Sequence, residues 1–378
     1  MLIGVAMATV AALIVAGILV AAGLVAPAVA AHVAFAIGIV PLILAAMTHF
    51  VPVLTRTGGS AGPVRYFPLV AQGGGLLAVL AMHGTLPHAF LHMAAAVDLV
   101  LALWLAVWIR ARARACLGAP HPGWRWYGMA LIALSLALFC ILLMPLFPAA
   151  HLALRLGHLH LNVLGLVGLA AFGTLPVLLP TALGRPDRAA TQWLVVRLRW
   201  LGGGALAGAA AGMASVTAFD FLVSPLAALA AALLLVPALV LAIQWVRGFG
   251  LQALRTDGAS ASLLAAVIGW GVLVVSGFGH ALGFWPARPA IAGFAVGFLL
   301  PLVTGALTQL LPVWRYPGVT RPERLAMRQR LARTGVWRAF LFVLAGGLVA
   351  LQVPIAGPLL ALFGLLIFIV ALFQSWRA

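Results

Sequence analysis

Histidine is the residue of this chain whose number and spacing could do chemistry. The chain has ten histidines, and eight of them fall at one end of the apolar stretches described below. These eight are His32, His83, His88, His92, His151, His158, His160 and His280. An ionisable residue inside a bilayer costs free energy, so histidines gathered at one depth indicate a layer that binds a metal ion or a metal cofactor.

The spacing of the histidines in this layer indicates which of them could bind a metal ion together. His88 and His92 are one helical turn apart, which lets two imidazoles reach one metal ion. His158 and His160 point about 200° away from each other, so one helix could serve two centres, one on each side. Three further members of the layer could be metal ligands or ordinary interfacial residues with a hydrogen bond: His83, His151 and His280.

The elements that must position these residues are membrane-spanning helices. Of the 378 residues, 65% are hydrophobic and only 7% are charged, unlike the composition of soluble proteins. With short connections between them, apolar stretches of about 20 residues predict one all-α integral membrane domain over 1–378. Twelve spans are expected, at 3–25, 28–52, 66–83, 86–109, 126–148, 151–180, 193–216, 221–246, 260–283, 286–312, 336–353 and 355–376.

The charges predict the orientation of these spans. All 22 basic residues are arginines, and twenty of them lie around the connections that follow even-numbered spans or in the C-terminal tail. The positive-inside rule therefore predicts a multi-pass protein of a bacterial-type inner membrane, with both termini in the cytoplasm and the histidine layer toward the outer side. His49 and His121 would lie on the inner side, in interfacial or solvated roles. The basic connection 318–335 is expected to form a helix on the anionic inner leaflet. The net charge of +17 reflects this topology, so no nucleic-acid partner is expected.

Spans two, six and ten share a pattern at their C-terminal ends. It reads Thr48-His49-Phe50-Val51-Pro52 in span two and Thr308-Gln309-Leu310-Leu311-Pro312 in span ten, each followed by arginine and glycine. Span six has a related end, with Pro180 before Gly184 and Arg185. Because the matched helices are four spans apart, we expect three pseudo-symmetric four-helix units, near 1–125, 126–255 and 256–378, around a pseudo-threefold axis.

The repeat pairs two histidines. His32 lies twenty residues before Pro52, and His160 lies twenty residues before Pro180, whereas span ten has Ala292 at this position. Both imidazoles would then lie about 30 Å from the proline end of their helices. This arrangement would suit a haem that stands between two helices and takes one axial histidine from each. The glycine runs at 73–75 and 202–204 would allow either close helix packing or room for a flat macrocycle.

The same residues carry a resemblance. The segment His158-Leu159-His160-Leu161-Asn162, with Gly165, Pro180 and Gly184 after it, resembles the His-x-His helix of haem-copper oxidase catalytic subunits. The helix from His32 to Pro52 resembles the second helix of these oxidases, and the short, histidine-rich chain is similar to the NnrS-type membrane proteins. This resemblance implies one or two haems b, with His32 and His160 on a low-spin haem. It implies that His158 faces a second centre, either a five-coordinate haem or a copper ion completed by His88 and His92.

The function that follows from this resemblance is electron transfer, or the binding or reduction of a small ligand such as nitric oxide or oxygen. The sequence leaves open whether the protein is an oxidoreductase of the oxidase or nitric oxide reductase type. It also leaves open whether a respiratory protein donates electrons to it. The chain has five acidic residues, and only Asp98 lies well inside a span, so no proton pumping is expected. Two alternatives remain: a transporter or chaperone that captures copper or haem, and a non-catalytic assembly partner of a respiratory complex.

Overall fold

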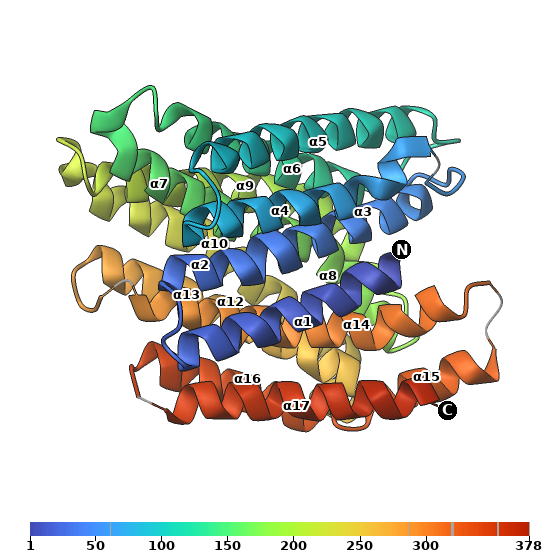
Figure 1. The fold of residues 1–378 in the computed structure, drawn as a ribbon. Helices are drawn as coiled ribbons and strands as arrows, with labels where there is room; N and C mark the ends of the chain where they lie inside the picture. Colours follow the sequence, from blue (N-terminus) through green and yellow to red (C-terminus); the bar gives the residue numbers. More distant parts are fainter. Residues whose placement is uncertain (61, 287, 319–320, 354, 378) are drawn as a thin grey trace. The chain divides into compact units, whose positions relative to one another are not determined.

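The computed structural model of the chain describes residues 1–60, 62–286, 288–318, 321–353 and 355–377. This part of the chain forms helices and turns and contains no strand. Eleven of the helices in it are long and apolar enough to cross a membrane, which confirms the all-α, multi-pass membrane architecture (Figure 1). The seventh predicted span, 193–216, forms the long helix α9, which carries Arg197 and Arg199 and is not among the eleven.

The chain divides into two compact units. Unit 1 consists of Met1–Gly173 and Leu194–Leu226. Its helices are α1 (Leu2–Ala21), α2 (Pro27–His32), η1 (Val33–Ile39), α3 (Val40–Leu54), η2 (Gly62–Tyr66), α4 (Phe67–His83), α5 (Ala89–Arg114), α6 (Gly123–Leu143), η3 (Pro148–Ala150), α7 (His151–His160), η4 (Leu161–Val167), the first part of α8 (Gly168–Ala182), most of α9 (Ala190–Ala214) and η5 (Asp220–Leu222).

Unit 2 consists of Thr174–Trp193 and Ala227–Ala378. Besides the second part of α8, it holds most of α10 (Val223–Phe249), α11 (Leu251–Thr256), α12 (Gly258–Ala281), α13 (Arg288–Phe294), η6 (Ala295–Leu299), α14 (Leu300–Arg315), α15 (Pro322–Ala332), α16 (Gly335–Ala350) and α17 (Ala356–Arg377). The three predicted four-helix units stay a prediction about the repeat in the sequence.

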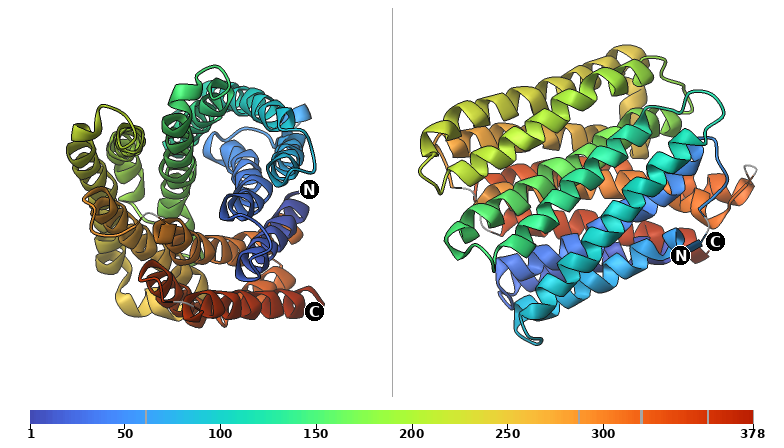
Figure 2. Two further views of the ribbon diagram at one scale, coloured as in Figure 1. Left: turned by 60° about the vertical axis from the view of Figure 1, so that its left-hand side comes forward. Right: turned by 90° about the horizontal axis from the view of Figure 1, so that it is seen from above.

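Seven of the eight clustered histidines belong to unit 1, at one end of its helices. Helix α4 ends at His83, α5 begins just after His88, and α7 begins at His151. The ribbon shows these helix ends on the same side of unit 1 as the start of α2 (Figures 1 and 2). We call this side the histidine end.

The three helices with the shared sequence pattern also share a break. Helix α2 continues into α3 through the π-helical segment η1, which covers the positions 13 to 19 residues before Pro52. In the same way η4 covers the positions 13 to 19 residues before Pro180, and η6 those 13 to 17 residues before Pro312. A π-helical turn is rare and often marks a functional region. Its recurrence in one register supports the predicted repeat.

A proline accounts for the break in two of these helices. Pro41 follows η1 and Pro301 follows η6, each 11 residues before the proline of the shared pattern. Because proline has no N–H, the carbonyl four residues earlier loses its helical donor. In the first helix that carbonyl belongs to Ile37, and the side-chain amide of Gln72 donates to it across from α4 (3.0 Å).

Close packing against α4 holds the same segment. Gly74 and Gly75 of α4 are buried, and a Cβ at Gly75 would overlap the backbone carbonyl of Ala36 in η1. A Cβ at Gly73, one residue earlier, would meet no atom within 4 Å. The glycine run 73–75 therefore serves close helix packing, one of the two roles expected for it.

The two neighbouring glycines give a matched test. We expect Gly75→Ala to lower the free energy of unfolding by about 2 kcal/mol or more, because the added methyl group would clash with backbone atoms of η1, which cannot shift without disturbing the helix. Gly73→Ala should instead raise it by up to about 1 kcal/mol, because alanine favours the helix. Thermal unfolding of the two purified variants, followed by tryptophan fluorescence, measures the difference. Equal melting temperatures would show that α4 does not pack on η1 in this way.

Candidate functional site

The first candidate site lies between two of the broken helices of unit 1. His32 ends α2 and His158 lies in the last turn of α7, each just before a π-helical segment. Their imidazole rings are parallel within 2°, and their centroids are 6.3 Å apart. The α2–η1 segment packs on α1 and α4, and the α7–η4 segment packs on α6, so the two rings reach toward each other from different neighbours.

Both rings are held through the same nitrogen. Nδ1 of His32 donates to the carbonyl of Ala28 (2.8 Å), and Nδ1 of His158 donates to the carbonyl of Ala137 on α6 (3.0 Å). A carbonyl only accepts, so in each bond the proton must be on Nδ1. Nε2 then keeps its lone pair, which is the state of a histidine that binds a metal through Nε2.

The separation of the rings fits one metal ion between them. Metal–nitrogen bonds of about 2.0–2.1 Å and a ring radius of roughly 1.1 Å place the centroids of two opposite imidazoles about 6.2–6.4 Å apart. The observed 6.3 Å falls in this interval. Rings that pack in an offset-parallel way also have centroids about 4.5–7 Å apart, so this separation is compatible with a shared metal ion and with ring packing.

His160 points the other way from His158, as the two-residue spacing predicts. Its Nδ1 donates to the carbonyl of Leu156 (2.8 Å), and its ring lies against Gly212 of α9, where a Cβ would come within 2.6 Å of the ring atoms. The structure therefore pairs His32 with His158 and not with the expected His160. The equal distances of His32 and His160 from their prolines predict that both lie at the same depth along their helices. Which face of α7 meets α2 depends on how α7 is rotated against α6.

Asn162 was named in the sequence only as part of the motif, yet it supports the pair directly. Its amide donates to the carbonyl of His158 (2.9 Å) and lies 3.4 Å from both ring nitrogens of His158. Asparagine four residues after a histidine on one helix is the signal that could have predicted this contact.

The other predicted ligands lie apart from this pair. His88 and His92 share one face of α5, as predicted, with ring centroids 5.7 Å apart. His83 bonds to the hydroxyl of Thr85 (3.0 Å), His280 donates to the carbonyl of Trp285 (2.9 Å), and His151 is exposed. Within the described ranges, no three histidine, cysteine, aspartate or glutamate side chains converge on one point that could hold a metal ion. Metal ligation by these residues stays a prediction.

Two further residues from the sequence have defined surroundings. His121, in the connection before α6, is half-buried, and its Nδ1 accepts from the backbone N–H of Gly123 (3.3 Å). Burial lowers the pKa of His121, so this residue is less solvated than expected. Asp98 on α5 lies against Gly74, and its Oδ1 is buried without a hydrogen-bond partner among the described residues.

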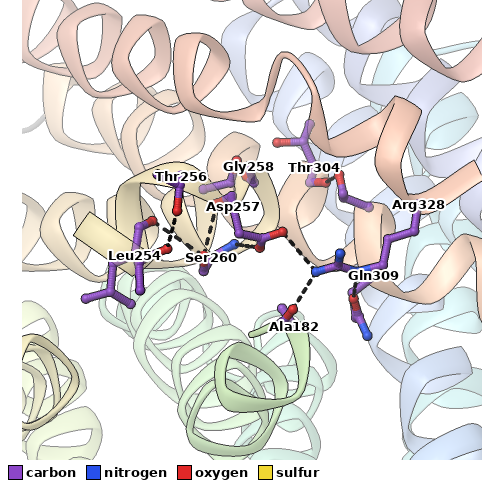
Figure 3. Close-up of polar contacts among 12 residues, drawn as sticks. Ala182, Leu254, Thr256, Asp257, Gly258, Ser260, Thr304, Gln309 and Arg328 are labelled. Atoms are coloured by element: carbon purple, nitrogen blue, oxygen red, sulfur yellow. Dashed lines mark hydrogen bonds and ion pairs between the residues drawn. The ribbon is translucent and has the colours of Figure 1, made fainter. Parts of the chain in front are cut away.

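A second polar cluster lies in unit 2, around Arg328 of α15 (Figure 3). Nε of Arg328 donates to Oε1 of Gln309 on α14 (2.7 Å), and Nη2 forms an ion pair with Oδ1 of Asp257 (2.9 Å). The same Nη2 donates to the carbonyl of Ala182 at the end of α8. Asp257 also caps α12, since its Oδ2 accepts from the N–H of Ser260 (2.9 Å). One guanidinium thus ties α15 to α14, to the start of α12 and to the end of α8.

The contacts of Arg328 differ from what the sequence predicts for the basic connection 318–335. The connection does form a helix, as predicted, with Met327 and Leu331 buried and Arg330 exposed. Arg328, however, points into the protein, which the sequence did not reveal because its partner Asp257 is 71 residues away. The cluster holds α15 in place, and it contains no group suited to redox chemistry.

Comparison of the chain with family models and with curated proteins finds no match.

Arg328 and Arg330, on one helix, test the role of the cluster. Arg328→Gln should lower the free energy of unfolding by about 1–3 kcal/mol, because it leaves Asp257 and the α8 carbonyl without their donor. Arg330→Gln should change it by less than about 0.5 kcal/mol, because Arg330 is exposed. Thermal unfolding and trypsin cleavage within α15 are the measurements. If Asp257→Asn and Arg328→Gln had fully additive effects, the ion pair would not contribute.

Proposed function

We propose that this chain is a membrane haem protein in which His32 and His158 hold one b-type haem at the histidine end of unit 1. The observation that carries the proposal is the parallel imidazole pair with a centroid separation of 6.3 Å. A haem needs only these two ligands from the protein, because its macrocycle supplies the other four nitrogens. Among the described residues no group of three possible protein ligands converges, and a haem does not need such a group.

The chain's own residues would prepare both ligands. The carbonyls of Ala28 and Ala137 fix the proton on Nδ1, orient each ring and make Nε2 more basic. Asn162 restrains the backbone at His158. The π-helical segments η1 and η4 begin directly after α2 and α7, so a change of helical pitch follows each of the two ligand-bearing turns.

This arrangement favours electron transfer. A haem held by both His32 and His158 would supply one-electron redox chemistry and would not bind a gas. We assign a second centre, haem or copper, to His160, because its ring points away from His32 and has the same Nδ1 anchor. Binding or reduction of nitric oxide or oxygen would belong to that second centre.

The proposal also gives the site a position in the membrane. The spans place the protein in a bilayer, and we infer from its arginines an inner membrane with cytoplasmic termini and the histidine end outside. A respiratory donor would then supply electrons. Asp98 is the one acidic residue well inside a span, so protons would come from the outer side and the protein would not pump them.

The pairing of His32 with His158 predicts which histidine variants lose the haem spectrum. His32→Ala and His158→Ala should each abolish the low-spin haem, because each removes one of its two axial ligands, whereas His160→Ala should retain it. His151→Ala is the matched control, an exposed histidine on the same helix as His158. The measurement is the reduced α-band and the pyridine haemochrome content of protein from haem-replete cells.

Two results would overturn this proposal. A colourless, iron-free wild-type preparation would remove the haem altogether. Loss of the α-band in His160→Ala with retention in His158→Ala would restore the pairing expected from the repeat and show that α7 is rotated differently.

A further inference from the structure

His88 and His92 form a second pair of imidazoles, away from the haem ligands. His88 precedes the first turn of α5 and makes no capping bond with its side chain, and His92 lies one turn later. Their ring centroids are 5.7 Å apart at an interplanar angle of 83°. His88 is exposed and His92 half-buried, so the pair lies at the surface of unit 1.

The spacing of the rings is close to that of two ligands on one ion. Two imidazoles bound side by side to a tetrahedral metal ion have centroids roughly 5 Å apart. The observed 5.7 Å needs only a small rotation of two side chains, one of which is exposed. The rings come from one rigid helix, so little else must be ordered on binding.

The rings also have no competing structural role. Nδ1 of His92 is buried without a hydrogen-bond partner among the described residues, unlike the anchored Nδ1 atoms of His32, His158 and His160. His83 and His280 at other helix ends are bonded as well. A histidine ligand without a second partner is poorly oriented, which favours weak, reversible binding over a resident cofactor.

We propose that His88 and His92 form a labile site for a divalent transition-metal ion that prefers imidazole, with water completing the coordination. Cu²⁺ should bind more tightly than Ni²⁺ or Zn²⁺, by the usual order of affinities for nitrogen ligands. The site is separate from the His32–His158 pair and does not depend on haem. It would capture metal ions from the aqueous phase at the histidine end.

The experiment uses full-length protein in detergent, purified through a tag without histidine. Cu²⁺ titration with electron paramagnetic resonance should reveal one site with two nitrogen ligands. His88→Ser and His92→Ala should each weaken binding tenfold or more and remove one nitrogen coupling. His83→Ala and His280→Ala are the controls, which should leave this site unchanged.

A spacing variant separates the site from non-specific binding by histidines. The double substitution His92→Ala/Met93→His keeps ten histidines but turns the second ring about 100° around the helix, so the two-nitrogen signal should disappear. Its survival in this variant, or its loss in His83→Ala, would overturn the proposal. The haem spectrum should stay constant in all these variants, so failure of this site and failure of the haem proposal give different results.

Discussion

A backbone carbonyl without a donor is costly inside a bilayer, and this constraint governs the structure. Three helices leave the α-helical hydrogen-bond pattern in the same register, and at η1 the neighbouring helices supply donors to the carbonyls concerned. At η1 the donors are Gln72 of α4 and Thr9 of α1, whose hydroxyl reaches the carbonyl of Gly38 (2.9 Å). These contacts fix the helix that carries His32.

The histidines obey the same constraint. His32 and His160 each donate to the carbonyl four residues earlier, and His158 donates to a carbonyl of α6. Each bond satisfies a polar N–H in apolar surroundings and fixes the proton of that ring on Nδ1. The need to satisfy a buried N–H thus accounts for the orientation of these rings.

The few acidic residues are divided between different tasks. Asp257 neutralises Arg328 and caps α12, so it stabilises unit 2. Asp98 lies against a glycine of α4, in the unit that holds the histidine pair. With carboxylates so scarce, the candidate centres depend on imidazole alone, which suits haem and transition metals better than Ca²⁺ or Mg²⁺.

The sequence by itself determined the all-α membrane architecture, the positions of most spans, the histidine layer and the shared register of spans two, six and ten. These properties depend on hydropathy and on spacing along one helix, which are local. Only the tertiary structure decided that His32 meets His158, that His160 meets Gly212 and that Arg328 meets Asp257. Such contacts depend on the rotation of each helix against its neighbours, and packing across many residues sets that rotation.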